Sequence, residues 1–425
     1  MHLNKKNITS YCIALFLATI LIVGAYIRLW GIDAWVLSTD DSYIRWLATV
    51  PAAPLPVNYT ESIYRWITVA FMPREHWYDI ISLTPLSGHP AFYYLLLHAL
   101  MQISEDPLFL RMLAFVPAML AVPLAYGLSR QSSGILSGCI AAIMLTFSDI
   151  HIVISQEIRS YSLFVFLLLL MFYSILRYDS SRKYGWLIVY AITAFLALFT
   201  HYGAVIPILC IGVVGMWRAC RRYRFVLHML IKDKGFIAWC ILHALLGVFY
   251  LWQNSILLEA SALQTPEDWW NVSLIARLAI STMIIATAPS KLFFADSSLL
   301  FMAPSFMFCL GLWALYRDRK YEWFFVALAS VSITFFLVAL NLHPYYAVRH
   351  FVHLFPVLLI TCSYPFSQSL RVDGRKIAFG FTGIFLVFFA YNLFGQGGNG
   401  LVPDSYRLTI SGNGDRQYKV KQKDW

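Results

Sequence analysis

The sequence contains little charge. Only 13% of its 425 residues are Asp, Glu, Lys or Arg, against roughly 25% in ordinary soluble domains. Hydrophobic residues make up 60%, and many separate apolar runs approach the ~20 residues that a helix needs to cross a bilayer. This composition excludes an ordinary soluble protein and predicts an all-α polytopic membrane protein.

Signatures of several function classes are missing. The sequence shows no P-loop, no glycine-rich dinucleotide-binding turn and no soluble nucleotide-binding segment. No internal repeat is evident, although many transporters are built from repeats. The seven cysteines follow no metal-ligand spacing, which predicts reduced packing residues and not a zinc site. Nucleotide-dependent chemistry therefore has no visible site in this chain.

The net charge of +10 is divided among short basic clusters. Loops poor in Lys and Arg alternate with these clusters, which is the pattern that marks cytosolic loops in membrane proteins. The basic residues therefore predict topology, with the N-terminus inside, and argue against nucleic-acid binding. The clusters are Lys5–Lys6, Arg177–Lys183, Arg218–Lys234, Arg317–Lys320 and Arg371–Lys376.

The length rule gives about eleven spans within a single transmembrane module, residues 1–394. The first run is expected to be a retained span, because it is longer than the apolar part of a signal peptide and lacks a small-residue cleavage site. The polar, glycine-rich tail, residues 395–425, is expected outside and flexible. The expected spans are 11–30, 111–128, 134–149, 162–176, 184–199, 203–219, 236–251, 298–316, 323–340, 346–367 and 377–394.

Two long outer segments separate groups of spans. The first, residues 31–110, is expected to carry juxtamembrane helices, and the second covers residues 253–297. Each contains a short apolar run, at 91–103 and at 274–290, that either crosses the membrane or lies at its surface. We interpret both as interfacial or re-entrant helices, because crossing with only one would place Arg218–Lys234 outside, against the positive-inside bias.

Polar motifs recur at the predicted outer ends of the spans. Ionisable residues beside or within a bilayer are costly and are usually kept for function. The motifs therefore predict a functional site on the outer face, although Asp40 can alternatively cap a juxtamembrane helix. They are Asp40–Asp41, Ser87–Pro90, Arg111, Ser155–Tyr161, Thr200–Tyr202 and Tyr346–His350.

In order and spacing these motifs resemble the polyprenol-phosphate-sugar-dependent glycosyltransferases of the C-type fold (GT-C). Within that group, the sequence is most similar to the dolichyl-phosphate-mannose protein mannosyltransferases and their bacterial relatives. The resemblance covers residues 27–202 well and the rest loosely. The family has Glu where this chain has Asp41, and a second proline where it has Ala91.

The resemblance implies a GT-C-like helical bundle with the activity of a membrane glycosyltransferase. Such an enzyme moves a sugar from a polyprenyl-phosphate donor to a lipid, glycan or protein acceptor by inverting transfer, which needs a single base. Asp40 occupies the position of that base, and the implied location is the periplasmic face of a bacterial inner membrane, or a lumenal face. Two alternatives stay open: a transporter or flippase of lipid-linked saccharide, and a non-catalytic subunit of a glycan assembly complex.

Arginine is suited to the donor phosphate, because its planar guanidinium makes two parallel charge-assisted hydrogen bonds. Arg349 is the first candidate, followed by Arg159 and Arg111. For these arginines, the alternative roles are reaching to the interface and pairing with Glu157. Gln156, Tyr161, His201 and Tyr202 are candidates to line a sugar pocket. For the two tyrosines and His201, the alternative is a place in the aromatic belt at the membrane interface. The substrate-binding candidates that remain are His89, Gln156, Glu157, Tyr161, His201 and Tyr202.

No cofactor is demanded by these residues. A divalent metal held by Asp41 and His89 is one interpretation, because histidine and carboxylate both suit zinc. For His89, which precedes a proline, a helix start or a hydrogen bond is the other interpretation. Asp41 can instead orient Asp40, pair with an arginine, or have a pure surface role.

Overall fold

A computed structural model describes residues 5–29, 80–81, 90–261, 274–293, 303–339 and 348–366. Within these ranges every regular element is a helix. Five of the described helices are long and apolar enough to cross a membrane, or six if one bent pair counts as a single span. The prediction of an all-helical membrane protein is confirmed. The full topology of about eleven spans stays a prediction.

The described helices follow the predicted order of spans. The first group is α1 (Lys5–Leu29), α5 (Phe92–Met101), α6 (Pro107–Ser133), α7 (Ile135–Thr146), α8 (Asp149–Gln156), α9 (Tyr161–Ser181), α10 (Tyr184–Leu198) and the 3₁₀ turn η2 (Tyr202–Ala204). The second group is α11 (Val205–Arg222), α12 (Leu227–Lys232), α13 (Lys234–Ser261), α15 (Leu274–Phe293), α16 (Ala303–Arg317), α17 (Tyr321–Ala339), η3 (Val348–Leu354), α18 (Phe355–Ser363) and η4 (Tyr364–Phe366).

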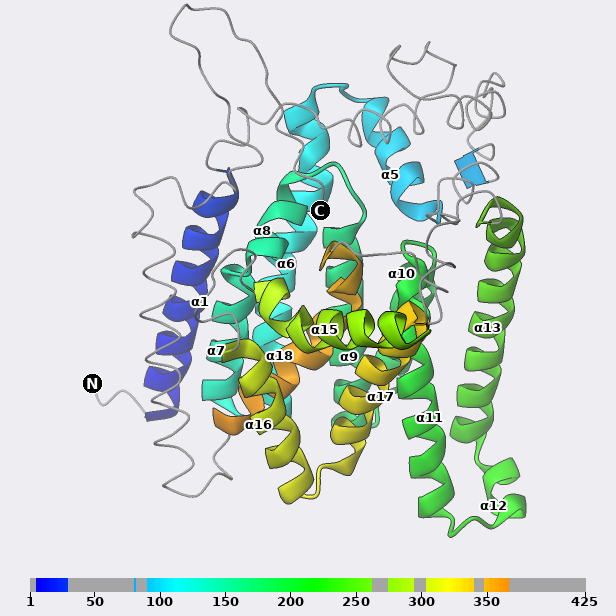
Figure 1. Cartoon of the computed structure of the whole chain (residues 1–425). Coiled ribbons are helices and arrows are strands. Elements are labelled where there is room, and N and C mark those ends of the chain that lie inside the picture. The colour runs from blue at the N-terminus through cyan, green and yellow to red at the C-terminus, as the bar shows by residue number, and fades with distance from the viewer. Residues whose placement is uncertain are drawn as a thin grey trace, which may run out of the picture.

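The axes of the long helices α6, α9, α11 and α13 are nearly parallel, and α13 runs in the opposite chain direction to the other three (Figure 1). α5 and the start of α6 lie at one end of this bundle, which we call the upper end, and α12 lies at the opposite, lower end (Figure 1). The basic turns after α9 and α11 are at the lower end, so the upper end is the one that the basic loops predict to be outside.

The core of the bundle is built on small residues of α6. Ala114, Ala118, Ala121 and Ala125 follow the helical repeat and are completely buried. α6 packs extensively against α7 and α9. Lipid removes most of the hydrophobic drive between helices, so small side chains that allow close backbone approach favour this packing. The same helix tolerates Pro117 and Pro123 in its interior.

α7 and α8 form one bent segment where a single span and a loop were predicted. α7 has only 12 residues, and α8 leaves it at an angle of 54°. Ser148 causes the break, because its side chain accepts a hydrogen bond from the backbone N of His151 at 3.2 Å and so caps a new helix. As a result Ser155 and Gln156, predicted in an outer loop, lie in the last turn of α8.

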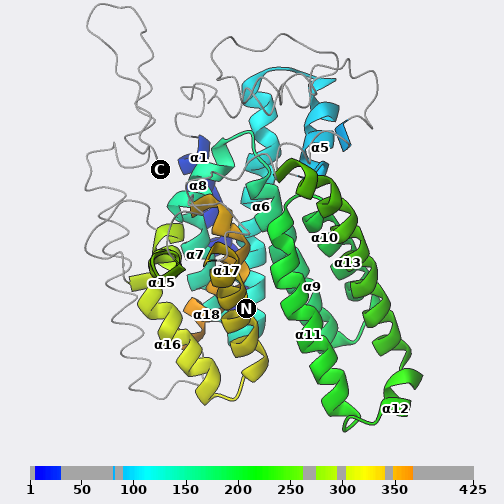
Figure 2. The ribbon, with the colours of Figure 1, turned by 45° about the vertical axis from the view of Figure 1, so that its right-hand side comes forward.

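The two short apolar runs of uncertain topology both form helices. α5 has 10 residues, fewer than the ~20 that a span needs. α15 has 20 residues with Pro289 inside it, and it lies across the direction of the long helices (Figures 1 and 2). An interfacial or re-entrant position for these two helices stays a prediction.

Candidate functional site

Several predicted site residues fall outside the part of the chain that the structure describes. These are Asp40, Asp41 and His89. For Arg349, the structure describes the backbone, which is part of η3, and not the side chain. Among the described residues, no group of three or more His, Cys, Asp or Glu side chains is arranged to hold a metal ion. The base and the metal ligands therefore stay predictions.

Two of the predicted motifs meet at the upper end of the bundle. Tyr161 begins α9, His201 precedes η2, and their ring centroids lie 5.5 Å apart. Phe164 stacks on His201 with 4.7 Å between centroids. The backbone N of Gly203 donates to Nδ1 of His201 at 3.0 Å. Because Nδ1 accepts, a neutral His201 carries its proton on Nε2. Both Tyr161 and His201 are buried.

The segment after α8 places polar side chains in the interior. Gln156 donates from Nε2 to the backbone O of Arg28 at 2.9 Å and so joins the ends of α8 and α1. Nε of Arg159 lies 3.7 Å from Oε2 of Glu157, and both side chains are buried. This ion pair matches one of the alternative roles predicted for Arg159. Since Glu157 offsets part of its charge, we expect Arg159 to bind a phosphate less tightly than an unpaired arginine would.

The late segment with Arg349 packs against the earlier motifs. η3 contacts α8, α9, α11 and η2. The elements that carry or adjoin Gln156, Tyr161 and His201 thus contact the segment of Arg349. Tyr202 lies within η2, beside His201. Arg111 is buried on α6, a helix that packs on α5, α8 and α9.

Sequence reasoning missed two buried polar pairs near these motifs. Arg28 is completely buried and donates from Nη1 to the backbone O of Gly24 at 3.1 Å. Nη2 of Arg28 lies 2.8 Å from Nδ1 of His151. In the second pair, Oγ1 of Thr334 lies 2.8 Å from Nε2 of His353, a residue of η3. Arg28 did carry a signal, because a lone arginine at the predicted outer end of a span runs against the positive-inside pattern.

Together these segments form a polar region inside an apolar bundle. Aromatic faces at Tyr161 and His201 suit the apolar face of a sugar ring. Amide and imidazole groups suit its hydroxyls, and an arginine at η3 suits a phosphate. The side chains of Gln156, Tyr161 and His201 are buried, and burial strengthens charge interactions.

Comparison with known proteins locates a family match over these motifs. A family model described as dolichyl-phosphate-mannose-protein mannosyltransferase matches residues 89–261. This region contains α5 through α13 together with Gln156, Tyr161 and His201. No curated protein matches the chain.

Two crystal structures of the Archaeoglobus fulgidus oligosaccharyltransferase are similar to the chain. The one in complex with Zn and sulfate is 15% identical with a TM-score of 0.49, over 88% of this chain and 51% of that one. The one tethered to an acceptor peptide containing the NVT sequon is 13% identical with a TM-score of 0.48, over 89% and 54%. The chain thus spans about half the length of the oligosaccharyltransferase.

Proposed function

We propose that this chain, which a family model described as dolichyl-phosphate-mannose-protein mannosyltransferase matches over residues 89–261, transfers a sugar from a polyprenyl-phosphate donor to a hydroxyl acceptor at the upper end of its helices. The acceptor is a lipid, a glycan or a protein. On the predicted topology, the reaction takes place on the periplasmic or lumenal side of the membrane.

The observation that supports this site most directly is the meeting of distant motifs at one place. Tyr161 and His201 are separated by the whole of α9 and α10, yet their rings lie 5.5 Å apart. The η3 segment with Arg349 packs on both α9 and η2. Polar side chains buried in a membrane protein are costly, so polar residues from distant parts of the chain are rarely brought together there unless they form a functional site.

In the proposed reaction the acceptor oxygen attacks the anomeric carbon of the donor. The bond from that carbon to the phosphate oxygen breaks, and polyprenyl phosphate leaves with the bonding electrons. Asp40 takes the proton of the acceptor hydroxyl. One base is sufficient, because the sugar is inverted in a single displacement. Arg349 stabilises the negative charge that develops on the leaving phosphate.

The remaining candidates hold the substrates. Tyr161 and His201 provide faces for the sugar, and Gln156 provides an amide for its hydroxyls. Tyr202, Arg111 and the Glu157–Arg159 pair complete the polar surroundings. In this proposal Asp41 orients Asp40, and His89 binds the donor. The alternative is a divalent metal held by Asp41 and His89.

The experiment that tests the proposal measures cleavage of the donor. The full-length protein is reconstituted in liposomes with polyprenyl-phosphate mannose and membrane acceptors, and released polyprenyl phosphate is quantified. Release that depends on the protein and is lost in Asp40→Asn is the expected result. A protein that moves intact donor between leaflets without releasing polyprenyl phosphate is a flippase, and this result contradicts the proposal. A folded protein that does neither fits a non-catalytic subunit.

A further inference from the structure

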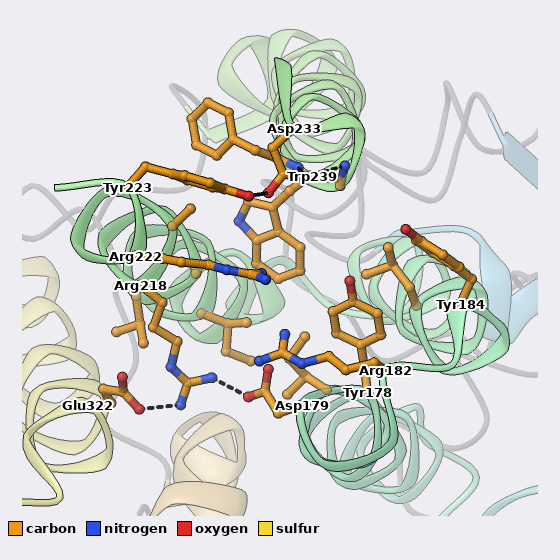
Figure 3. A pocket seen from close by; sticks show the side chains of 18 of the residues that line it. Tyr178, Asp179, Arg182, Tyr184, Arg218, Arg222, Tyr223, Asp233, Trp239 and Glu322 are labelled. Carbon is orange, nitrogen blue, oxygen red and sulfur yellow. Dashed lines mark hydrogen bonds and ion pairs between the residues drawn. The ribbon is translucent and has the colours of Figure 1, made fainter. Parts of the chain in front are cut away.

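The lower end of the bundle contains a cavity on the side opposite the proposed site. Its volume is about 810 Å³, which falls in the range of roughly 300–1,000 Å³ that is usual for small-molecule sites. The walls come from the lower ends of α9, α10, α11, α13 and α17. Ten of its lining residues are labelled in Figure 3. None of them takes part in the proposed glycosyl transfer.

The acidic residues of the cavity already have partners within the protein. Arg218 forms hydrogen-bonded ion pairs with both Asp179 and Glu322, as the dashed lines in Figure 3 show. Asp233 accepts a hydrogen bond from the hydroxyl of Tyr223 at 2.7 Å. This bond lowers the pKa of Asp233, so the group stays a carboxylate and stays engaged. Two backbone amides at the start of α13 also donate to it.

The other two arginines of the cavity are less strongly held, although the charge of Arg222 acts on nearby Asp233. Arg182 follows α9 and Arg222 ends α11, and both guanidinium groups point into the cavity in Figure 3. Arg182 lies over the ring of Tyr178 at 5.8 Å, and Arg222 over the ring of Tyr223 at 5.6 Å. Among the described residues, neither arginine forms an ion pair. Their aromatic contacts orient the two positive charges toward the same space, which favours an anion between them.

Part of the cavity wall is apolar, and on the predicted topology the cavity lies at the cytosolic interface of the membrane. Trp239 and Phe236 of α13 and Val326 of α17 are among the lining side chains. The other face of α13 exposes Ile241, Leu245 and Val248, the kind of surface that lipid covers. Tryptophan and tyrosine gather where hydrocarbon meets headgroups. A soluble anion would use the two arginines but gain nothing from the apolar wall.

We propose that this cavity binds the phosphate of an anionic phospholipid, with its headgroup between Arg182 and Arg222 and its first acyl carbons against Trp239. On the predicted topology this is a lipid of the cytosolic leaflet. Basic pockets between membrane helices on that side are suited to anionic headgroups. Guanidinium groups suit phosphate better than ammonium groups, because each can make two parallel bonds to its oxygens.

Binding is tested on the full-length protein in detergent with phosphatidylglycerol, phosphatidylcholine, glycerol phosphate and inorganic phosphate as probes. We expect phosphatidylglycerol to bind about tenfold or more tightly than the other three, since charge-assisted bonds and acyl burial act together. Arg182→Gln combined with Arg222→Gln should remove that preference. Arg221→Gln is the matched control, because Arg221 is exposed on the same turn but does not line the cavity.

A photoactivatable phosphatidylglycerol locates the bound lipid independently of affinity. Crosslinks to the turn after α9 and to the start of α13 support the proposal, and crosslinks confined to other helices overturn it. The proposal is also overturned if Arg221→Gln weakens binding as much as the double variant does, since the effect is then one of general charge. Glycerol phosphate that binds as tightly as the lipid would make the cavity a site for a soluble phosphate compound instead.

Discussion

The guanidinium of Arg28 lies 2.8 Å from Nδ1 of His151, and both side chains are completely buried. Arginine has donors only, so Nδ1 of His151 must accept and the imidazole must be in its Nε2-protonated form. The pair joins α1 to α8, two elements that border the candidate site. A charge in the interior of a membrane protein is costly unless it is held by several hydrogen bonds, and Arg28 also donates to carbonyls of Gly24 and Leu145.

Removal of this guanidinium should destabilise the protein. In Arg28→Met the carbonyls and His151 lose a buried donor, and each unsatisfied group costs about 1–3 kcal/mol. We expect a clear fall in the thermal midpoint in detergent, and a smaller fall for Arg28→Lys, which keeps the charge but has a different geometry. Lys183→Gln, at an exposed turn, is the control and should leave the midpoint unchanged. An Arg28→Met protein as stable as the parent would show that the network does not stabilise the fold.

Two glycines offer a matched test of the His201 position. A methyl group at Gly203 would lie 3.0 Å from Nδ1 of His201, whereas one at Gly185 would have no neighbour within 4 Å. Gly203→Ala should therefore displace His201 by a few tenths of an ångström and lower sugar transfer by up to about tenfold, since a misplacement of about 1 Å can cost about a hundredfold. Gly185→Ala, inside α10, should keep full activity and gain up to about 1 kcal/mol of helix stability. Equal activity in the two variants would remove His201 from the sugar pocket.

Asp40→Asn tests the proposed base. The amide keeps the size of the side chain but cannot accept the acceptor's proton, so transfer should fall by about 10²–10⁴-fold. The detergent thermal midpoint should stay near that of the parent. Near-normal turnover would leave Asp40 as a helix cap. Asp41→Asn is the companion variant, and a smaller loss there is expected because Asp41 acts through Asp40.

Arg349 and Arg159 can be separated by their effects on donor binding. Arg349→Ala should weaken binding of polyprenyl phosphate more than Arg349→Lys does, since lysine retains charge without the planar fork. Arg159→Gln should have the smaller effect, because Glu157 already pairs with that guanidinium. The measurement is equilibrium binding of polyprenyl phosphate to folded protein. If Arg159→Gln weakens binding more than Arg349→Ala, the phosphate lies at the other arginine.

On the predicted topology, cysteines placed at the two ends of the bundle should be labelled from opposite sides of the membrane. Glu105 and Arg221 are exposed, at the upper and lower ends respectively, and each can be changed to cysteine in a protein without native cysteines. An impermeant maleimide should label position 105 from outside and position 221 only after the cytosol is opened. The reverse pattern would place the candidate site in the cytosol and contradict the proposed use of a donor on the outer side.

The order of helices was predictable because apolar runs and basic turns alternate in the sequence. Residues 162–176 were expected to form a span. The observed helix, α9, covers them and is only slightly longer, Tyr161–Ser181. The break at Ser148 was not predictable from apolar length, because a polar N-cap inside a hydrophobic stretch changes the direction of the helix without changing its composition. The motif at Tyr161 and His201 was found because polar residues at the ends of spans are conspicuous.

The Arg28–His151 pair could not be found in the same way. It joins residues 123 positions apart, and its existence depends on how α1 packs against α8. Arg28 alone is conspicuous at the outer end of a span, but nothing in the sequence identifies His151 as its partner. Similarly, the sequence left the pairing of Arg159 with Glu157 as an open alternative. Only the side-chain geometry shows that the two groups lie close enough to form an ion pair.

α9 extends from one functional region to the other. It begins with Tyr161, against His201, and its last turn carries Asp179, which is bound to Arg218. A helix of 21 residues is about 30 Å long, so a tilt of about two degrees at its lower end moves Tyr161 by about 1 Å. α9 thus joins the two proposed sites, so a lipid bound in the cavity and a sugar bound beside Tyr161 would contact opposite ends of one helix.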